Sequence, residues 1–305
     1  MPVPRIGVVI ATHDRPQLLR TAIHSVLDQR HEGDLEVVVV FDGAEPDLAL
    51  VSDVSSRRVQ VCRNTRTAGL AGARNTGILL MDTELIAFCD DDDTWLEGKL
   101  VAQLERLTAQ PDAEFVTTAM RVDYGERSTV RLAGTDQVTV HQLVRSRMAM
   151  LHASSFLFRR DAMLGPDGFG LVDETMPRSM AEDWDLLIRA SRKRPIEHVD
   201  KPLVRVLWGA SSYFNDAWAD RNEAHKLLIE RHPEIRADQM ALGLLLGKLA
   251  FGHAALKERR AALRCVGAAL RANWREPRTA IAVLVLLGLS PGWVTKEFNR
   301  RGHGI

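Results

Sequence analysis

The chain has 305 residues, 46% of them apolar, which is enough for one large domain or a domain and a half with a substantial core. Forty basic residues balance forty acidic ones, so the charge gives no sign of a nucleic-acid partner. We expect no signal peptide, and three widely spaced cysteines that are free thiols in a reducing, cytoplasmic setting; a disulfide framework and a zinc site are not expected.

The first part of the chain is expected to alternate strands and helices. Apolar runs predict buried strands at 6–11, 35–41, 58–62 and 85–89. The helix between the first two strands is expected to begin with Asp14 as its cap and Pro16 in its first turn. A strand, a helix and a strand within this length form a βαβ unit, which implies parallel pairing.

After residue 114 the pattern changes. Antiparallel strands are expected at 115–122 and 128–132, with further strands at 153–158 and 196–206. Pro202 lies inside the last of these and indicates an edge or a bulge. The segment 165–178 is rich in Gly and Pro and is expected to be a mobile loop.

The end of the chain is expected to be helical, so the domains are predicted as 1–215 and 216–305. Amphipathic helices are predicted at 218–231, 237–256 and 258–273. The apolar run 279–289 is shorter than the ~18–20 residues that a membrane span needs. It is either a buried helix of a C-terminal helical subdomain or a membrane-surface element flanked by Arg and Lys.

Four consecutive carboxylates, Asp90 to Asp93, follow the strand at 85–89. They repel each other unless a cation or hydrogen-bond donors compensate their charge. A solvated acidic turn is the simplest interpretation. However, ligands bind at the carboxyl ends of strands in α/β sheets, so the position favours a divalent cation that holds a diphosphate.

The segment 64–77 concentrates glycines around Arg74. It is either a helix start loosened by glycines or a backbone that approaches a phosphate or base closely, with Arg74 as the charged contact. Neither a P-loop nor a G-x-G-x-x-G fingerprint is present.

Five short motifs occur in a fixed order, at Val8–Arg15, Phe41–Ala44, Ala73–Gly77, Asp90–Trp95 and Glu182–Leu186. Together they resemble the GT-A nucleotide-sugar glycosyltransferases of the inverting family 2, over roughly residues 5–210. Phe41 replaces the first Asp of the family's D-D-G-S turn. The resemblance implies an α/β GT-A (Rossmann-like) fold, with a mixed, mainly parallel sheet flanked by helices, here followed by a C-terminal helical subdomain.

The resemblance also implies roles for the donor site. Thr12 and Asp42 would lie around the base of a UDP- or dTDP-sugar, with Asp42 accepting the imide N–H. Arg74 would contact the base or the diphosphate. Asp90 and Asp91 would lie near the ribose and the metal.

A divalent cation, Mn²⁺ or Mg²⁺, is implied as the cofactor, with Asp92 as its principal carboxylate ligand beside Asp90. Asp183 would be the general base that takes the acceptor's proton, with Glu182 as the alternative. Attack opposite the leaving diphosphate implies inversion at the anomeric carbon.

Several of these residues have simpler interpretations. Asp183 at a helix start could be a cap, and Asp42 could be a turn residue. His152 and His198 are expected to be packing or surface histidines. Where the family often has a His after its last core strand, residues 208–211 read Trp-Gly-Ala-Ser, and Arg205 is a candidate diphosphate contact.

The expected function is therefore metal-dependent, inverting transfer of a sugar to the hydroxyl of a glycan, lipid-linked or small-molecule acceptor. A nucleotidyltransferase is the alternative enzyme, although residues 12–16 lack the glycine- and lysine-rich loop that it needs. A nucleotide-sugar-binding scaffold without catalysis is the alternative from another class. A cytoplasmic location is expected, with peripheral membrane contact through the C-terminal helices left open.

Overall fold

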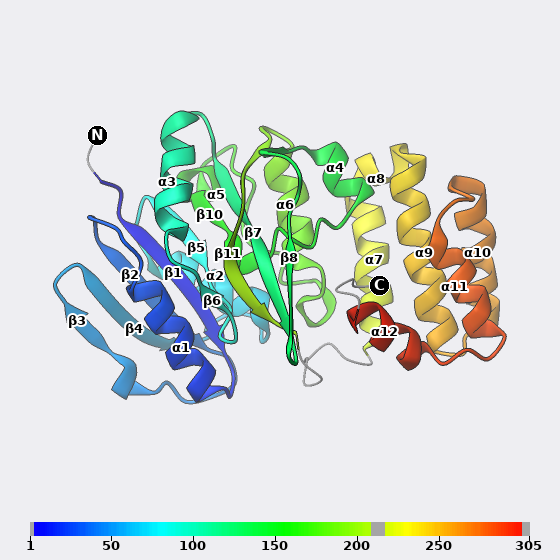
Figure 1. Ribbon diagram of the computed structural model, residues 1–305, viewed down its shortest axis with the longest axis horizontal. Helices are drawn as coiled ribbons and strands as arrows, with labels where there is room; N and C mark the ends of the chain where they lie inside the picture. The colour runs from blue at the N-terminus through cyan, green and yellow to red at the C-terminus, as the bar shows by residue number, and fades with distance from the viewer. Residues whose placement is uncertain (1–2, 209–216, 301–305) are drawn as a thin grey trace. The chain divides into compact units, whose positions relative to one another are not determined.

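The computed structural model describes residues 3–208 and 217–300. These divide into two compact units. The first is Met1–Thr139, Met148–Glu174 and Arg189–Trp208, and the second is Val140–Arg147, Thr175–Ile188 and Gly209–Ile305. The predicted domain boundary at 215/216 lies outside the described residues. The sheet belongs to the first unit (Figure 1).

Four neighbouring strands of the first unit are parallel, in the order β4 (Arg57–Arg63), β2 (Leu35–Phe41), β1 (Ile6–Thr12) and β5 (Leu85–Phe88). Their apolar runs are buried, as a strand covered on both faces requires. The connecting helices are α1 (Pro16–Leu27) and α2 (Leu70–Leu80), and α3 (Lys99–Ala109) follows β5. The predicted βαβ organisation is confirmed.

The sheet continues past β5 with mixed pairing. β10 (Leu157–Arg159) is antiparallel to both β5 and β7 (Phe115–Tyr124), and β7 is parallel to β11 (Ile196–Leu207). β8 (Arg127–Arg131) pairs with β7, while β6 (Thr94–Trp95) and β9 (Gln137–Val138) pair with β11. The register between β7 and β11 shifts on both sides of Pro202, so the predicted bulge is confirmed.

Some predicted details differ. Helix α1 has Arg15, not Asp14, at its cap, and no side chain bonds to the cap position. Of the strand predicted at 153–158, only the end is β10, because Ala153–Ser155 forms a 3₁₀ turn, η2. The edge strand β3 (Ser52–Val54) was not predicted, since three residues give no periodic signal. The three cysteines are unpaired, as expected.

The remaining helices are short or C-terminal. The first unit also holds the 3₁₀ turn η1 (Leu48–Leu50) and α5 (Arg160–Leu164). Helix α6 (Glu182–Ser191) belongs to the second unit up to Ile188 and to the first unit from Arg189. The second unit contains α4 (Val140–Arg145), η3 (Pro177–Ser179), α7 (Trp218–Arg231), α8 (Pro233–Ala237), α9 (Gln239–Ala255), α10 (Arg259–Ala272), α11 (Pro277–Leu286) and α12 (Pro291–Arg300).

Helix α9 is the centre of the second unit. It packs against α7, α10 and α11, and its residues are mostly Leu, Ala and Gly (Figure 1). Small residues let the neighbouring helices approach closely: a Cβ added at Gly252 would lie 2.0 Å from Asn222 Oδ1 on α7. Within residues 3–208 and 217–300, every helix is too short or too polar to cross a bilayer.

Candidate functional site

The four carboxylates form a tight turn at the end of β5, in the middle of the sheet. The backbone N–H of Asp93 donates to the carbonyl of Asp90 over 3.1 Å, which closes the turn. The side chains of Asp91 and Asp93 are buried. The carboxylates are therefore built into the sheet edge, and the interpretation as a solvated acidic turn does not describe them.

Residues before β10 complete this turn. Because β10 runs antiparallel to β5, with Leu157 opposite Ala87, its start lies beside the end of β5. The buried Ser154 hydroxyl accepts from Asp90 N over 2.9 Å and donates to Asp93 Oδ2 over 2.5 Å. His152 Nδ1 lies 3.1 Å from the same carboxylate oxygen.

Asp90, Asp93 and His152 form a group that can hold a metal ion. Each offers one ligand atom, and these atoms lie within 4.8 Å of one another. His152 Nδ1 also accepts from the N–H of Ser154 over 3.4 Å, and as an acceptor it lies beside the carboxylate oxygen of Asp93. Two such acceptors in contact need a proton or a cation between them. Carboxylates with one imidazole suit Mn²⁺, and Mg²⁺ less well. The donor set fits the implied cation.

The other two carboxylates of the turn are engaged by the end of β1 and the start of α1. Thr12 Oγ1 donates to Asp91 Oδ2 over 2.7 Å. Arg15 donates to Asp91 Oδ1 over 3.2 Å and forms an ion pair with Asp92. The predicted ligand Asp92 therefore has an arginine partner and is not part of the converging group; its metal role stays a prediction.

The crowded charges act on the pKa values of the turn. Burial and, after it, the carboxylates of Asp93 and Asp90 together raise the pKa of Asp92 to about 7, against the opposing effect of Arg15. Burial also raises the pKa of Asp90, but Arg74, together with His152 and Arg15, outweighs it and holds that pKa below its usual value. Negative charge at this turn is thus only partly compensated by the protein.

Arg74, which the sequence singled out, contacts the turn directly. Its Nη2 donates to Asp90 Oδ1 over 2.6 Å, and its guanidinium lies 5.1 Å from the centre of the Phe88 ring. The side chain is buried. Helix α2 delivers this arginine, so the glycine-rich segment is a helix start whose charged residue reaches the acidic turn.

Asp42 is tied to the loop before α2. Its Oδ1 accepts from Asn64 Nδ2 over 2.8 Å, and its Oδ2 accepts from the N–H of Gly69 over 2.8 Å. Gly69 has φ +121°, which favours glycine, and a Cβ at Gly72 would lie 1.8 Å from Thr67 O. Each carboxylate oxygen of Asp42 keeps a further lone pair for a ligand.

Glu182 and Asp183 begin α6 and belong to the second unit. Asp183 Oδ2 is ion-paired with Arg147, and its Oδ1 accepts from the N–H of Trp184 over 2.7 Å. Glu182 is buried, with 5% of its surface exposed. The next carboxylate, Asp185, lies 2.9 Å from His232 Nε2.

Sequence reasoning missed Asp93, His152, Ser154 and Arg15 as members of the site. The signal for Arg15 was present, because it ends the motif that starts at Val8. The signal for His152 would have been an antiparallel strand beside β5. His198 is a buried residue of β11, bonded to Thr117 Oγ1 over 2.8 Å, as expected of a packing histidine. Arg205 donates to Asp123.

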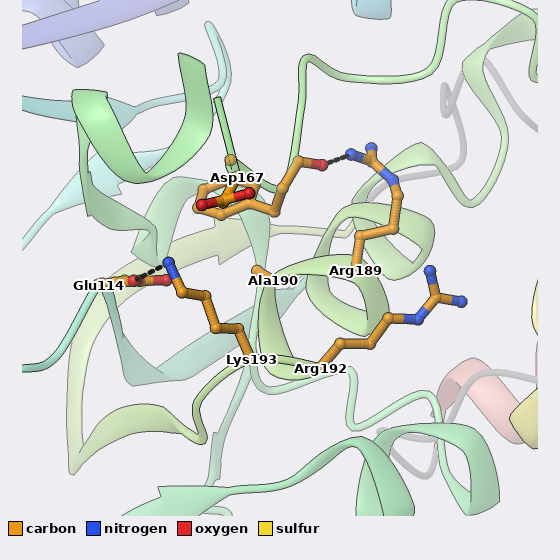
Figure 2. A pocket seen from close by; sticks show the side chains of 8 residues that line it. Glu114, Asp167, Arg189, Ala190, Arg192 and Lys193 are labelled. Carbon is orange, nitrogen blue, oxygen red and sulfur yellow. Dashed lines mark hydrogen bonds and ion pairs between the residues drawn. The ribbon is translucent and has the colours of Figure 1, made fainter. Parts of the chain in front are cut away.

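A hollow of about 360 Å³ lies elsewhere in the first unit and contains none of the predicted site residues. It is lined by Glu114, Asp167, Gly168, Phe169, Arg189, Ala190, Arg192 and Lys193. Figure 2 shows Lys193 reaching Glu114, at 3.1 Å, and Arg189 bonded to a carbonyl of its wall. Three of its charged groups, Glu114, Lys193 and Arg189, thus have partners within the wall.

Comparison with known sequences identifies glycosyltransferases among the relatives of this chain. The sequence model of Glycosyl transferase family 2 matches residues 7–164, just over half of the chain. An uncharacterized glycosyltransferase of Rickettsia bellii is 31% identical over 121 residues, which cover 39% of this chain and 17% of that protein.

Two further relatives have more specific names. The amylovoran biosynthesis glycosyltransferase AmsB of Erwinia amylovora is 26% identical over 200 residues, 61% of this chain and 64% of AmsB. The UDP-Glc:alpha-D-GlcNAc-diphosphoundecaprenol beta-1,3-glucosyltransferase WfgD of Escherichia coli is 28% identical over 102 residues, 33% of this chain and 40% of WfgD. The chain thus spans less than two thirds of the length of each of these three relatives.

Solved structures share the fold. TarS 1–349 of S. aureus in complex with UDP-GlcNAc superimposes with a TM-score of 0.62 at 16% identity, over 98% of this chain and 92% of that one. The mannosyltransferase PcManGT from Pyrobaculum calidifontis, in complex with GDP-Man and Mn²⁺, gives 0.57 at 18% identity, over 93% and 86%. The predicted GT-A fold is confirmed, and with the family match over half of its length the chain belongs to the family 2 glycosyltransferases.

Proposed function

We propose that this glycosyltransferase is metal-dependent and inverting, and that it moves a sugar from a nucleotide-diphosphate donor, with UDP- or dTDP-sugars favoured, to a hydroxyl acceptor. The observation that carries the proposal is the convergence of Asp90, Asp93 and His152 at the end of the central strand β5. The UDP-GlcNAc bound to TarS and the GDP-Man and Mn²⁺ bound to PcManGT support a nucleotide sugar and a cation.

In this proposal the first unit binds the donor, and residues 1–215 carry the reaction. Asp42 accepts the imide N–H of the base, and Thr12 orients Asp91 toward the ribose. Arg74 contacts the base or the diphosphate while it holds Asp90 in place. Arg15 is a second cation at the turn and would also face the diphosphate.

The metal site would be made by Asp90, Asp93 and His152, with Asp92 as the ligand proposed from sequence. A bound Mn²⁺ or Mg²⁺ supplies positive charge that offsets the charge of the departing nucleoside diphosphate. Ser154 positions two ligands at once, because its hydroxyl joins the backbone of Asp90 to the carboxylate of Asp93.

Asp183 is the proposed base, with Glu182 as the alternative. The Asp183 carboxylate takes the proton of the acceptor hydroxyl while the hydroxyl oxygen bonds to the anomeric carbon. The bond from that carbon to the diphosphate oxygen breaks at the same time. Arg147 and the N–H of Trp184 orient the carboxylate. The nucleoside diphosphate leaves on the opposite face, so the configuration at the anomeric carbon inverts.

We also propose peripheral membrane contact through the C-terminal helices. The outward positions of α11 follow helical spacing and are all apolar: Ala280, Val283, Leu284 and, just past its end, Leu287. Leu287 is 80% exposed, and the flanking Trp274 and Trp293 are 71% and 59% exposed. Residues 257–300 carry nine Lys and Arg against three Asp and Glu. Exposed Trp and Leu beside basic residues suit an anionic lipid surface.

The transferase proposal is tested by nucleotide release. Purified protein is supplied with Mn²⁺, a panel of UDP-, dTDP- and GDP-sugars, and lipid-diphosphate, glycan and small-molecule acceptors. We expect release with a uracil or thymine donor, and an inverted product by NMR. Asp183→Asn should bind donor and lose turnover, whereas Asp93→Ala should lose metal-dependent donor binding. Binding without turnover on every acceptor would instead support the scaffold alternative.

A further inference from the structure

A group of basic side chains gathers in the second unit, apart from the acidic turn. We call it the basic cluster. Its members come from four elements that are distant in sequence: Arg147 after α4, Arg221 and His225 on α7, Lys248 on α9, and Arg278 on α11. Helix α9 packs against both α7 and α11 (Figure 1).

Helices α4, α7 and α11 all contact α9, so the basic side chains that they carry or precede lie in one region of the second unit. Burial and, after it, the charges of Arg278, Arg221 and Arg147 together lower the pKa of Lys248 to about 7, against the opposing effect of Glu276. Burial likewise holds the pKa of His225 well below its usual value, with Lys248, Arg221 and Arg278 acting in the same direction. The protein thus concentrates basic groups where burial and their neighbours make the charged form costly.

Packing fixes the cluster independently of these charges. On α9, Gly252 lies against Asn222, and Gly247 lies against Glu276 and Arg278, since a Cβ there would be 2.8 Å from Glu276 Cγ. The two glycines are about 7.5 Å apart along the helix axis. Lys248 lies between them in sequence, where α7 and α11 both approach α9.

Polar atoms in this region lack partners. Asn222 is 3% exposed, and neither its Nδ2 nor its Oδ1 has a hydrogen-bond partner among the described residues. The same holds for His225 Nδ1 and for Thr279 Oγ1, with 7% and 2% of these residues exposed. Native proteins rarely leave buried polar atoms unpaired, so such a concentration points to a ligand that fills the region.

The acidic partners of the cluster are few. Glu276 Oε1 accepts from Arg278 Nη1 over 2.7 Å, and Asp183 is ion-paired with Nη2 of Arg147. Arg147 Nη1 and Arg278 Nε are buried and have no partner in the described part of the chain. Arginine donors left over after a carboxylate is bound are well suited to phosphate oxygens.

We propose that the basic cluster binds a phosphate group of the acceptor. The inference rests on the proposed function, and it narrows the acceptor to a phosphate-bearing molecule, either a sugar diphosphate or a phosphodiester. Arg147 links this site to Asp183, the proposed general base. Its Nη2 binds the Asp183 carboxylate, and its Nη1, which has no partner among the described residues, can donate to the phosphate. A hydroxyl next to that phosphate would then lie near Asp183. The diphosphoundecaprenol in the name of WfgD is an acceptor of this chemistry.

Lys248→Met tests the proposal, because it removes one charge and keeps the length of the side chain. Without divalent cation or nucleotide, we expect inorganic pyrophosphate or glycerophosphodiester to raise the melting temperature of the wild type, with affinity at least tenfold weaker in Lys248→Met. Whichever of the two anions binds shows whether the phosphate group of the acceptor belongs to a diphosphate or to a phosphodiester. Lys248→Arg should retain binding, as should the control Lys226→Met, whose lysine is exposed and paired with Glu223. Equal binding by the wild type and Lys248→Met, or no binding of either anion, would overturn the proposal.

Two further measurements separate this site from a purely structural one. Without anion, Lys248→Met should melt at a higher temperature than the wild type, because it relieves repulsion; a lower temperature would contradict the argument. With Mn²⁺, its donor affinity should be unchanged, while the KM for a phosphate-bearing acceptor rises at least tenfold. Should Lys248→Met not fold, Arg221→Gln is measured in the same way.

The anion measurements need no turnover, so the two proposals can fail separately. Pyrophosphate binding that depends on Lys248 in a protein with no transfer activity would defeat the proposed function and leave the anion site standing. Transfer to a phosphate-bearing acceptor with the same KM in the wild type and Lys248→Met would defeat the anion site and leave the proposed function standing.

Discussion

Asn75 binds the backbone of Val172 with both atoms of its amide. Nδ2 donates to the Val172 carbonyl over 2.8 Å, and Oδ1 accepts from the Val172 N–H over 3.0 Å. Nδ2 also donates to Glu174 over 2.7 Å. The side chain therefore ties the irregular segment before Glu174 to helix α2, next to Arg74.

Asn75→Ala should destabilise the first unit. It leaves the buried N–H and C=O of Val172 without partners, at a cost of about 2–4 kcal/mol in the free energy of unfolding. Urea denaturation measures this. The control is Leu79→Ala on the same helix, whose side chain is 45% exposed and whose loss should cost no more than ~0.5 kcal/mol. Equal effects of the two changes would contradict the role of Asn75.

His152→Ala should weaken Mn²⁺ binding by about tenfold or more and Mg²⁺ binding less, because the imidazole favours the softer ion. Titration of Mn²⁺ by electron paramagnetic resonance, with UDP present, measures the affinity. The control His24→Ala removes an exposed histidine of α1. If His152→Ala leaves the Mn²⁺ affinity unchanged and Asp92→Asn lowers it, Asp92, the ligand predicted from the sequence, is favoured over His152.

Gly72→Ala should destabilise the protein by roughly 2 kcal/mol or more, because a methyl group there would lie 1.8 Å from Thr67 O and must displace the loop that holds Asp42. Gly267→Ala is the matched change in another helix. Its Cβ would have nothing nearer than Arg271 Nη1 at 3.8 Å, so it should stabilise by about 0.5–1 kcal/mol. Thermal unfolding of both variants should therefore shift in opposite directions.

Lys99 should make stability depend on pH. It is fully buried, donates to Gln103 Oε1 over 2.9 Å, and lies 3.7 Å from the centre of the Trp95 ring. Burial lowers its pKa from 10.5 to about 7. Between these values the unfolded chain binds more protons than the folded one, so the stability contributed by this group is present above pH 10.5 and is lost as the pH falls through 7.

We therefore compare the wild type with Lys99→Met by urea denaturation at constant ionic strength. The difference in the free energy of unfolding, wild type minus variant, should rise by about 2 kcal/mol from pH 7 to pH 9. The same comparison with Lys226→Met, an exposed lysine, should be flat. A difference for Lys99 that does not change with pH would show that the amine is charged in the folded protein.

The membrane proposal predicts that Leu284→Glu with Leu287→Glu reduces cosedimentation with vesicles of phosphatidylcholine and phosphatidylglycerol by about tenfold or more, since two apolar side chains no longer enter the lipid. Leu48→Glu, at a 75% exposed leucine of the first unit, should have no effect. Equal vesicle binding by all three proteins, or none by the wild type, would refute the contact.

The sequence by itself determined the local elements. Continuous apolar runs specify β1, β2 and β5 because buried parallel strands need no polar face, and the run Asp90–Asp93 directly after β5 puts carboxylates at a sheet edge. The family motifs also named Arg74, which does contact Asp90.

Only the tertiary structure decided which distant residues complete the site. His152 and Ser154 reach Asp93 because the three-residue strand β10 pairs antiparallel with β5, and Arg15 reaches Asp92 across 77 residues of sequence. These contacts produce no periodic pattern in the sequence, since strand order and direction depend on pairing between segments far apart in the chain. The basic cluster has the same origin: its charges lie on separate helices that only packing around α9 brings together.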